Sequence, residues 1–563
     1  MKRIFTLLIC SLFAWNASAQ EKLNADDVFS QFGEVYFTFE LSDAQSIHTL
    51  TKIISIDNVK GSTVWAYANK KEFSSFTKTG IRYTLLKHPA ELVKAEVTDS
   101  PAQVLTWNYY PTYSAYENLM LQFQTLYPDI CQLVTIGTLP SGRKILAAKI
   151  SGNVGVDEDE PEFMYVSSLH GDETAGYITM LHLIDYLLTN YGTSQRITNM
   201  VNTMEIYINP LANPDGTYSG GNNSVNGATR YNANYVDLNR NFSDPQDGQH
   251  PDGEIWQPET VAAMNFATSR HITMSANFHG GAEVVNYPWD TWTRLHADDN
   301  WWKFVSREYA DTVHLHSSGG YLTDLDNGIT NGYAWYSISG GRQDYMTYFQ
   351  HGREATIELS YDKLLPTSQL INHWNYNYRS LLNYMEQSLY GIRGIVTDSA
   401  TGAPLHAKIF IAGHDIDSAQ VYANLPVGDY HRLLKAGNYT LKFSSPGYPS
   451  KTFSNIAVSD KNTVRLDVQL YKGSMTAVDG PAPKWLNVFP NPATGDNALI
   501  QSDFTLMEIS ITDIFGHVVK HVYPQSDRYI LPINELSNGI YVVEVRTKDL
   551  RVARQKLIIK RAK

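Results

Sequence analysis

The sequence contains very little cysteine. Only Cys10 and Cys131 occur among its 563 residues. Cys10 lies in an N-terminal segment that we expect to be removed, so the mature chain would keep Cys131 alone. No internal disulfide could then form, and this excludes a disulfide-stapled scaffold even in a compartment that permits one.

Long apolar runs are also scarce. Near the N-terminus, residues 4–15 are mostly apolar, two basic residues precede them, and the small residues 17–19 follow. This order is typical of a secretory signal peptide, and the run is too short to span a bilayer. We therefore expect residues 1–19 to be a signal peptide. A lipid anchor at Cys10 is disfavoured because the apolar run before it is very short.

Positive charge is in deficit. The chain has 45 Lys and Arg residues against 57 Asp and Glu, which gives a formal net charge of -12. A general nucleic-acid or anionic-membrane binder needs a basic surface, so both classes are excluded. Hydrophobic content of 43% and charged content of 18% are typical of a globular protein. A chain of 563 residues is expected to form more than one domain.

Alternation of apolar and polar residues predicts a small N-terminal domain over residues 20–104. Segments with the period of a half-buried strand are separated by helical segments. The expected strands are 34–40, 63–68 and 81–86, and the expected helices are 73–78 and 43–54, the latter with Ser42 as its N-cap. This order favours a compact α+β unit.

The pattern changes in the central block, residues 105–390. Continuous apolar or β-branched strands alternate there with helices, which is typical of an α/β domain with a mixed, largely buried sheet. Examples are the strands 163–168, 204–209 and 272–277 and the helices 177–188 and 261–270.

Short strands with Gly and Pro turns follow the central block. They predict a small β-sandwich over residues 391–472, a linker over 473–484 and a second β domain over 485–563. No catalytic cluster is visible in the first of these β domains.

Four polar motifs follow strands in the central block. They are His170-Gly-Asp-Glu173, Asp237-Leu-Asn-Arg-Asn241, Asn277-Phe-His279-Gly-Gly and Ile357-Glu358-Leu-Ser. Ligands collect where strands end in open α/β sheets. A His and a Glu at this spacing are by themselves more often a surface ion pair. Here His170 and Glu173 follow a strand and open a helix, so they can converge, and His279 is the best third donor. Two His and one Glu form the ligand set of a catalytic zinc site with one open position.

These motifs resemble those of the zinc metallocarboxypeptidases, specifically the branch named after carboxypeptidases N and E. The resemblance covers roughly residues 105–390. It includes residues 170–176, 213–216, 227–242, 277–290, 332–348 and 357–366. Gly280-Gly281 and the run from Gly340 to Asp344 favour the N/E branch. The implied fold class is α/β: a mixed-sheet zinc carboxypeptidase domain with a small N-terminal α+β domain and two C-terminal β-sandwich domains.

The resemblance implies a role for each motif residue. His170, Glu173 and His279 would bind one Zn²⁺. Glu358 would act as general base toward the attacking water and then as general acid toward the leaving amine. Arg230 would stabilise the oxyanion of the tetrahedral intermediate.

The same resemblance implies a grip on the substrate's chain end. Asn239 and Arg240 would hold the terminal carboxylate, which a planar guanidinium binds through two parallel hydrogen bonds. Tyr336 would close over the substrate. Asp237 would accept a hydrogen bond from a ligand histidine, although a helix or turn cap is an equally good interpretation of this residue.

Side-chain specificity follows less directly. In the family, Gln343 at the pocket floor and an acid at the position of Asp290 favour C-terminal Arg or Lys. Arg342 stands where the branch usually has an uncharged residue, and a cation there would weaken that preference. Asp172 replaces the branch's usual Asn between the ligands, and we expect this polar exchange to be tolerated.

The flanking segments also carry resemblances. Residues 391–471 are similar to the transthyretin-like domain that follows the catalytic unit in the N/E branch. Residues 485–563 resemble the C-terminal sorting domain of type IX secretion cargo, although another adhesive β-sandwich is an alternative. The sorting resemblance implies the type IX secretion machinery as a partner and a secreted or cell-surface location.

The N-terminal unit occupies the place of the activation segment of digestive carboxypeptidases, which the N/E branch normally lacks. Its expected role is to shield the site or to assist folding. Two other functions stay open at this point: a peptidoglycan-peptide hydrolase of the same fold and a catalytically inactive surface-binding protein. The complete ligand set together with Glu358 argues against the inactive protein.

Overall fold

The computed structural model describes residues 23–41, 44–472, 484–514, 518–549 and 551–561. The expected signal peptide, the Ser42 cap and nearly all of the expected linker therefore lie outside the described residues. None of the helices in these ranges is long and apolar enough to cross a membrane.

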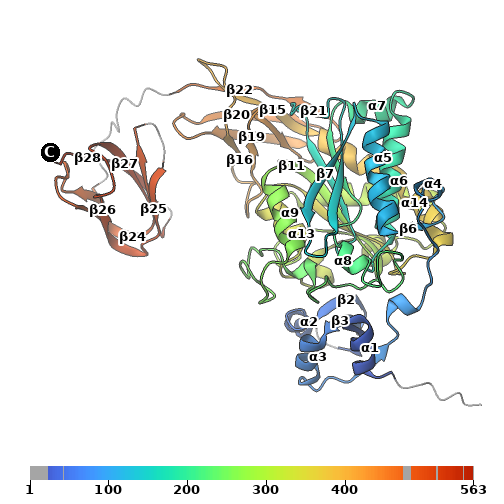
Figure 1. The fold of residues 1–563 in the computed structure, drawn as a ribbon. Coiled ribbons are helices and arrows are strands. Elements are labelled where there is room, and N and C mark those ends of the chain that lie inside the picture. Colours follow the sequence, from blue (N-terminus) through green and yellow to red (C-terminus); the bar gives the residue numbers. More distant parts are fainter. Residues whose placement is uncertain (1–22, 42–43, 473–483, 515–517, 550, 562–563) are drawn as a thin grey trace, which may run out of the picture.

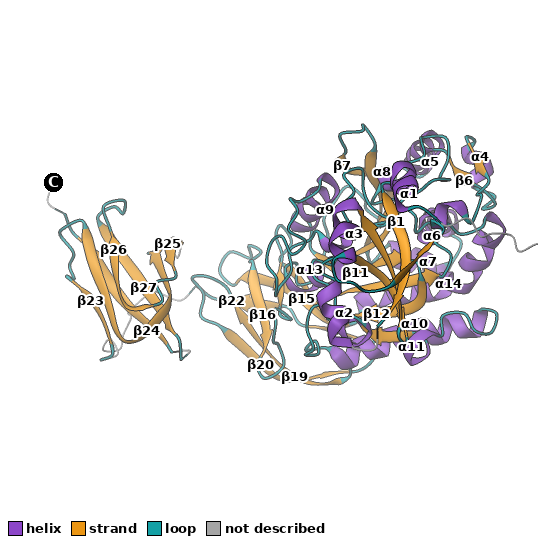
Figure 2. Ribbon diagram, turned by 90° about the horizontal axis from the view of Figure 1, so that it is seen from below, coloured by secondary structure: helices purple, strands orange, loops and turns teal. Residues whose placement is uncertain are grey.

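The N-terminal unit is a four-stranded antiparallel sheet with three helices (Figure 1). The strand order is β2-β3-β1-β4. The strands are β1 (Glu34–Glu40), β2 (Ser55–Lys60), β3 (Thr63–Asn69) and β4 (Tyr83–Leu86), and the helices are α1 (Ala25–Phe32), α2 (Ala44–Leu50) and α3 (Lys70–Thr77). The sheet lies between its helices and the central domain, which the resemblance predicts to be catalytic and which is called the catalytic domain below (Figures 1 and 2). One sheet face is therefore turned toward that domain.

One predicted boundary in this unit is wrong, and two of its elements were not predicted. Helix α2 ends at Leu50, not at residue 54, and the sequence analysis missed strand β2 directly after it. Asp57, Asn58 and Gly61 look like turn residues because Asp, Asn and Gly are depleted in strands. β2 forms nevertheless as an edge strand, since pairing with β3 satisfies its backbone. Helix α1 was also not predicted.

The catalytic domain has an eight-stranded mixed sheet with the order β13-β12-β14-β11-β9-β10-β8-β7. The strands are β7 (Cys131–Thr138), β8 (Lys144–Ile150), β9 (Glu162–Ser167), β10 (Glu205–Asn209), β11 (Ile272–His279), β12 (Ala282–Tyr287), β13 (Ile329–Asn331) and β14 (Glu354–Ser360). The inner strands β10, β9, β11 and β14 are parallel, and they are almost entirely buried. This confirms the predicted mixed-sheet α/β class.

Helices cover both faces of this sheet. One apolar core includes residues of α5 (Tyr113–Leu126), α6 (Ala175–Asn190), α10 (Asp299–His316) and α14 (Leu370–Glu386). A second, smaller core includes residues of α9 (Pro258–Thr268) and α13 (Arg342–Tyr348). The inner strands are therefore buried on both faces because they face a core on each side.

Two β domains follow. The first has one sheet of β18 (Asp429–Arg432), β15 (Gly391–Asp398), β21 (Thr463–Arg465) and β22 (Val468–Leu470), and another of β17 (Val421–Ala423), β16 (Ala407–Ile411), β19 (Gly437–Ser444) and β20 (Lys451–Val458). The expected strand 464–468 is split into β21 and β22. The second domain is a sheet of β23 (Leu486–Phe489), β24 (Asn497–Asp513), β25 (Val518–Val522), β26 (Ser526–Pro532), β27 (Gly539–Thr547) and β28 (Val552–Ile559) around its own core.

Candidate active site

Three parallel strands end side by side at one edge of the catalytic sheet. β11 pairs with β9 on one side and with β14 on the other, and the register places His279 beside Glu358. After β9 the chain turns into α6 through a loop that carries His170 and Glu173. Ser168 starts this loop with a φ of 54° and donates a hydrogen bond of 3.0 Å to the backbone oxygen of Glu173. Strand order thus brings the predicted donors to one place.

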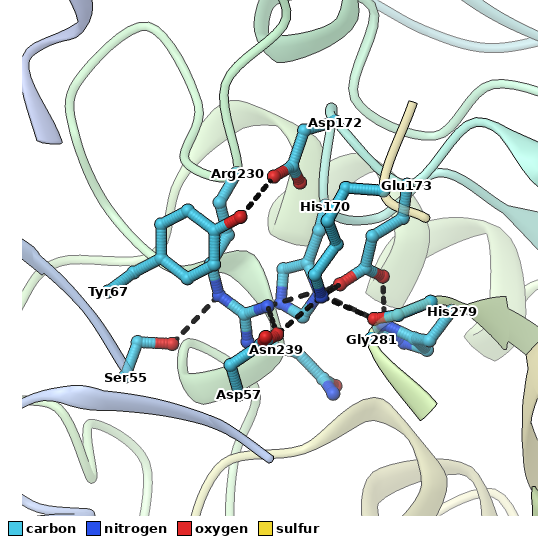
Figure 3. Close-up of polar contacts among 12 residues, drawn as sticks. Ser55, Asp57, Tyr67, His170, Asp172, Glu173, Arg230, Asn239, His279 and Gly281 are labelled. Carbon is cyan, nitrogen blue, oxygen red and sulfur yellow. Dashed lines mark hydrogen bonds and ion pairs between the residues drawn. The ribbon is translucent and has the colours of Figure 1, made fainter. Parts of the chain in front are cut away.

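The three candidate metal ligands converge (Figure 3). The Nδ1 atoms of His170 and His279 lie 3.0 Å apart. Glu173 reaches both rings: Oε1 lies 3.0 Å from His170 Nδ1, and Oε2 lies 2.7 Å from His279 Nδ1. One ligand atom from each residue falls within 4.8 Å of the other two, and all three residues are buried. The predicted triad is therefore compact enough to share one ion.

Asp237 combines the two roles that the sequence left open. Its Oδ1 accepts a hydrogen bond of 2.9 Å from His170 Nε2, and the same oxygen accepts one of 2.8 Å from the backbone N–H of Asn239. Asp237 thus caps the short helix η2 (Leu238–Arg240) and orients the histidine. A proton on Nε2, shared with Asp237, would leave the lone pair of His170 Nδ1 directed at the cluster once a metal is bound.

The donor set fits a zinc ion. The lone pair of His170 Nδ1 faces a second imidazole nitrogen and an acidic oxygen, an arrangement that a shared cation stabilises. His279 Nε2 is buried without a hydrogen-bond partner, so Nδ1 is the ring nitrogen of His279 that faces the other donors. Burial opposes ionisation of Glu173, but His170, Lys363 and His279 outweigh it and hold the pKa of Glu173 well below its usual range.

Arg230 lies against the metal ligands. Its Nη1 donates to Glu173 Oε1 at 3.1 Å, and its Nη2 lies 3.3 Å from Asp237 Oδ2. Burial works against the charge of Arg230, yet Asp237, Glu173 and Asp57 raise its pKa well above the ordinary value. A permanently charged guanidinium therefore stands next to the place where a reacting carbonyl would lie.

Asn239 and Arg240 are held by the backbone of neighbouring loops. Asn239 Oδ1 accepts a hydrogen bond of 2.9 Å from the backbone N–H of Arg342. Arg240 Nη1 donates to the backbone oxygen of Asn239 at 2.9 Å, while its Nε is buried without a partner. Gly340 packs on this turn, since a Cβ there would approach the backbone oxygen of Arg240 to 2.2 Å. The unused donor of Arg240 remains available to a carboxylate.

Glu358 is buried and is 8% exposed. Burial and the nearby negative charges of Glu173 and Asp57 raise its pKa well above the ordinary value, although Lys363 and Arg230 act in the opposite direction. A carboxyl with a raised pKa beside a metal site is suited to proton transfer near neutral pH.

The predicted specificity residues form a second buried group. Asp290 accepts a hydrogen bond of 3.0 Å from Asn286 Nδ2, and burial raises the pKa of Asp290 to about 6. The Asp344 carboxylate accepts hydrogen bonds from the backbone N–H groups of Asp290 and Thr291. Gln343 accepts from the backbone N–H of Thr356 at 2.8 Å, and its Nε2 has no partner.

Arg342 points away from this group. Its Nε lies 3.2 Å from Glu354 Oε1, and its Nη2 contacts the sulfur of Met164 at 3.8 Å. Arg342 also borders a small cavity under the sheet with Met164 and Phe266. Its charge is therefore matched by Glu354, away from Asp290.

Comparisons with known proteins place this geometry in a family. A family model described as zinc carboxypeptidase matches residues 116–380. The mouse carboxypeptidase N catalytic chain is 34% identical over 384 residues, which are 62% of this chain and 82% of that protein. Carboxypeptidase SOL1 of Arabidopsis thaliana is 34% identical over 368 residues, 64% of this chain and 72% of that protein. The chain belongs to the zinc carboxypeptidase family. The family implies Zn²⁺ as the cofactor, and His170, Glu173 and His279 are the possible metal-binding group around which the site is arranged.

Other comparisons cover the fold and the flanking domains of this zinc carboxypeptidase. Human carboxypeptidase D is 35% identical over 376 residues, and the chain spans only 26% of that longer protein. Carboxypeptidase A from Helicoverpa armigera shares the fold, with a TM-score of 0.50 and 17% sequence identity. The match covers 63% of this chain and 97% of that chain. Residues 391–471 match a carboxypeptidase regulatory-like domain, and residues 487–560 match a secretion system C-terminal sorting domain.

The N-terminal unit reaches into the site of this zinc carboxypeptidase along strand β2 (Figure 3). Ser55 Oγ accepts from Arg230 Nε at 2.8 Å and donates to Asp237. Asp57 Oδ1 lies 3.2 Å from Arg230 Nη1 and also accepts from Lys363 Nζ. The backbone oxygen of Ile56 accepts from Arg240 Nη2 at 3.1 Å. β2 therefore engages both guanidinium groups that the sequence assigned to the substrate.

Further contacts hold this unit in place. Glu34 of β1 accepts hydrogen bonds from the backbone N–H groups of Arg230 at 2.8 Å and Tyr231 at 3.0 Å. Tyr336, the predicted substrate-covering tyrosine, packs into the apolar core of the N-terminal unit, and its hydroxyl donates to the backbone oxygen of Asp57 at 3.4 Å. In this conformation Tyr336 is thus engaged by the N-terminal unit.

The sequence analysis missed four residues at the site: Ser55, Asp57, Tyr67 and Lys363. Tyr67 donates to Asp172 at 2.7 Å, so the polar exchange at Asp172 has a partner in the N-terminal unit. Lys363 Nζ donates to Glu173 Oε1 at 2.8 Å and is 4% exposed. Lys363 lies inside the motif at residues 357–366, and this position was the one sequence feature that could have identified it. Ser55, Asp57 and Tyr67 come from a separate domain, and no sequence feature linked them to the site.

Proposed function

We propose that the protein is a secreted zinc-dependent metallocarboxypeptidase. It would remove the C-terminal residue of peptides or proteins, with a preference for Arg and Lys. The observation that carries the proposal is the convergence of His170, Glu173 and His279 within 4.8 Å next to Arg230 and Arg240. A metal centre beside cations that recognise a chain end is suited to cleaving the last peptide bond and no internal one.

The chain's own residues supply most of the chemistry. His170, Glu173 and His279 would hold Zn²⁺, which when bound supplies a Lewis acid for the scissile carbonyl and for water. Glu358 takes a proton from the attacking water and returns it to the leaving amine as the C–N bond breaks. Arg230 donates to the oxygen on which negative charge develops, and Arg240 with Asn239 holds the terminal carboxylate.

Preference for a basic side chain is supported by the charges of the buried group. Asp290 is 3% and Asp344 1% exposed, and Asp290 gains ionised character as pH rises through about 6. Gln343 adds an amide without a partner at Nε2. Arg342, the cation that was expected to weaken this preference, is paired with Glu354. An incoming ammonium or guanidinium group would therefore meet the carboxyl of Asp290, whose ionised form the nearby Arg240 favours. Burial and Asp290 raise the pKa of Asp344 well above its usual range, so Asp290 is the acid that would carry the charge.

Peptides that differ only in their last residue test both parts of the proposal. The protein, freed of its N-terminal unit, is incubated with peptides ending in Arg, Lys, Phe, Leu and Glu, and loss of one residue is followed by mass spectrometry. We expect fastest loss of Arg and Lys. Loss of Phe but not Arg would overturn the preference. Cleavage only of a peptidoglycan stem peptide would favour the alternative hydrolase.

The proton-transfer role of Glu358 has its own test. Glu358→Gln should abolish turnover while the catalytic Zn²⁺ stays bound, because the amide keeps the shape but cannot take a proton. Retained activity would show that another group is the base, and binding without any turnover in the parent enzyme would favour an inactive binding protein.

We further propose that the N-terminal unit blocks the site until it is removed. His170, Glu173, His279 and Arg230 are each 3% exposed or less, and Arg240 is 7% exposed, so a peptide has no access in this conformation. The carboxylate of Asp57 and the backbone oxygen of Ile56 lie on the cations that a substrate would need. A protease could release the unit by cleaving the chain at residues 91, 92 and 94, which are exposed. They directly precede Ala95, whose backbone hydrogen-bonds to Asn226 of the catalytic domain.

An engineered protease site at residues 91–94 tests this block. We expect at least a tenfold rise in activity after cleavage and separation of the unit. Asp57→Ala should raise the activity of the uncut chain, whereas Lys71→Ala, which removes the peripheral ion pair with Glu254, should not. Equal rates before and after cleavage would reject the block, and unequal refolding yields alone would leave only a folding role.

The sorting domain at residues 487–560 supports export. We propose that the chain is directed by its signal peptide and then by the type IX secretion machinery to the cell surface or the medium. Deleting residues 485–563 should retain the protein in the periplasm, as measured by fractionation; unchanged export would reject the role.

A further inference from the structure

A second group of metal-type donors lies at the other edge of the catalytic sheet. Asp159 stands three residues before β9, at the amino end of the strand whose carboxyl end leads to His170. Asp429 and His431 lie on β18 of the regulatory-like domain, two residues apart and thus on one face of the strand. One ligand atom from each of the three lies within 4.8 Å of the other two. The group therefore joins the two domains.

The polar atoms of this group are incompletely satisfied. His431 Nε2 lies 3.1 Å from Asp429 Oδ2, but His431 Nδ1 is buried without a partner, and the side chain is 5% exposed. Asp159 pairs with Arg465 through Oδ2, while its Oδ1 is buried without a partner. An unpaired buried carboxylate oxygen is costly, which makes it a strong candidate for a ligand atom.

Negative charge is concentrated around the group. Burial and Glu205 raise the pKa of Glu162 to about 8, and Asp429 adds to the effect. Burial, Glu158 and Glu205 raise the pKa of Glu160 to about 7. Burial is the main reason that both carboxyls resist ionisation, and the acids Glu158, Glu205 and Asp429 add to it against the opposing effects of Arg393 and Arg270. The acids around the group would favour a divalent ion.

We propose that Asp159, Asp429 and His431 bind a divalent transition-metal ion, Zn²⁺ or Mn²⁺, that clamps the regulatory-like domain to the catalytic domain. An imidazole with two carboxylates suits such ions, whereas Ca²⁺ prefers oxygen ligands alone. The side chains of Asp159 and Asp429 are 20% and 14% exposed, so water can complete the coordination. Arg465 keeps Asp467 as a partner at 2.7 Å when Asp159 turns to the ion.

Metal counting on the full chain tests the proposal. After saturation with Zn²⁺ and dialysis, mass spectrometry of the metal content should give two equivalents for the parent protein. His431→Ala should retain one equivalent and, after cleavage of the N-terminal unit, the carboxypeptidase activity of the equally cleaved parent. Asp159→Asn replaces His431→Ala if that variant is insoluble. The matched control His406→Ala removes a histidine of the same domain outside the group and should retain two equivalents.

A second background separates this site from the active site. His279→Ala should lose the catalytic ion and keep one equivalent, and the double variant with His431→Ala should hold none. In the His279→Ala protein, Zn²⁺ or Mn²⁺ should raise the melting temperature, Ca²⁺ at the same concentration should not, and His431→Ala should abolish the rise. One equivalent in the saturated parent, or an unchanged count in His431→Ala, would show that the three residues form only an interdomain ion-pair network and would overturn the proposal.

Discussion

Buried carboxyl groups dominate the chemistry of this protein at the scale of single residues. His170 and Lys363 lower the pKa of Glu173 despite its burial. Burial and neighbouring acids instead raise the pKa of Glu358 well above its usual range. The two groups differ because cations outweigh burial at Glu173, whereas at Glu358 burial and the acids Glu173 and Asp57 outweigh Lys363 and Arg230. These environments are consistent with the proposed roles of Glu173 as a ligand and Glu358 as a proton carrier.

Asp290 offers a prediction about specificity. Asp290→Asn should lower kcat/KM for peptides ending in Arg by about 10- to 100-fold, because it removes the negative charge that would pair with the Arg side chain. This loss corresponds to about 1.4 to 2.8 kcal/mol of binding free energy. Peptides ending in Leu should be affected much less, because their side chains bring no charge. Steady-state kinetics on the two peptide series measures the ratio, and an equal loss on both would show that Asp290 acts only through the structure of the pocket.

Glu162 predicts a pH dependence of stability. Its folded-state pKa is about 8, against roughly 4.3 for an unfolded chain. A raised folded pKa means that its contribution is fully present below about pH 4.3 and is lost as pH rises toward 8. Glu162→Gln should therefore raise the melting temperature at pH 8 and change it little at pH 5.

The exposed acid Glu158 provides the control for that experiment, because Glu158→Gln changes the same loop at its surface. Calorimetry at the two pH values, with chelator present, measures both variants. A melting temperature of Glu162→Gln that follows the parent at both pH values would contradict the assignment.

At this scale the sequence predicted that the motif residues lie close together, but it did not reveal their partners. His170, Glu173, His279 and Arg230 lie in motifs whose spacing is set by local chain direction. Asp57 meets Arg230 only because a separate domain docks on the site. Contacts between residues more than 170 positions apart leave no periodic signal in the chain.

Strand β2 shows how one element acquires a special role. Ile56 pairs with Ala66 and Asn58 with Trp65, so Asp57 is the extra residue of a bulge on an edge strand. Bulges redirect side chains and mark the ends of regular pairing. Ser55 and Asp57 are 2% and 5% exposed and face the catalytic domain, whereas Ile56 packs in the unit's own core. The bulge explains both the missed strand and its reach into the site.

The loop between β9 and α6 supports a prediction at the scale of elements. A Cβ on Gly171 would lie 2.3 Å from the backbone of Gly216 in α8 (Pro214–Thr217). Gly171→Ala should push the loop that carries His170 and Glu173 away from His279, weakening Zn²⁺ binding and lowering activity by at least tenfold. Chelator titration followed by activity measures both effects.

Gly155→Ala is the matched control, because nothing lies within 4 Å of the added carbon there. It should leave zinc affinity and activity unchanged. Normal zinc affinity in Gly171→Ala would mean that the loop can shift without moving its ligands.

At the scale of the whole molecule, the catalytic and regulatory-like domains are joined by a buried charge network. Asp298 of the catalytic domain accepts from Arg432 Nη1 of β18 at 2.8 Å and from Arg353 Nη2 at 2.8 Å. Arg432 is fully buried and also pairs with Asp415 at 2.6 Å. Arginine pairs hold the pKa of Asp298 well below its usual range despite its burial. Docking is thus built on matched internal charges.

Breaking this network should loosen the domain. Arg432→Met leaves two buried acids short of a partner, and such losses cost about 3–5 kcal/mol. We expect a clear fall in melting temperature and faster proteolysis near residue 390. Arg294→Met, which removes an exposed interdomain pair with Asp417, should cost about 0–1 kcal/mol. Similar effects of the two variants would contradict the role given to the buried network.

The domain order was readable from composition and turn patterns, but the placement of the N-terminal unit was not. That unit covers the site through β1 and β2 and packs against Tyr336 of the catalytic domain, and these parts meet only in the folded chain. Its sheet faces the catalytic domain (Figure 2). A strand pattern reports which face is buried and does not report what buries it.

Anomalous diffraction at the zinc absorption edge tests the central claim most directly. Crystals of the full chain grown with Zn²⁺ should show a strong peak bounded by Nδ1 of His170, Nδ1 of His279 and the carboxylate of Glu173. An active protein with no peak between these three groups would contradict the account.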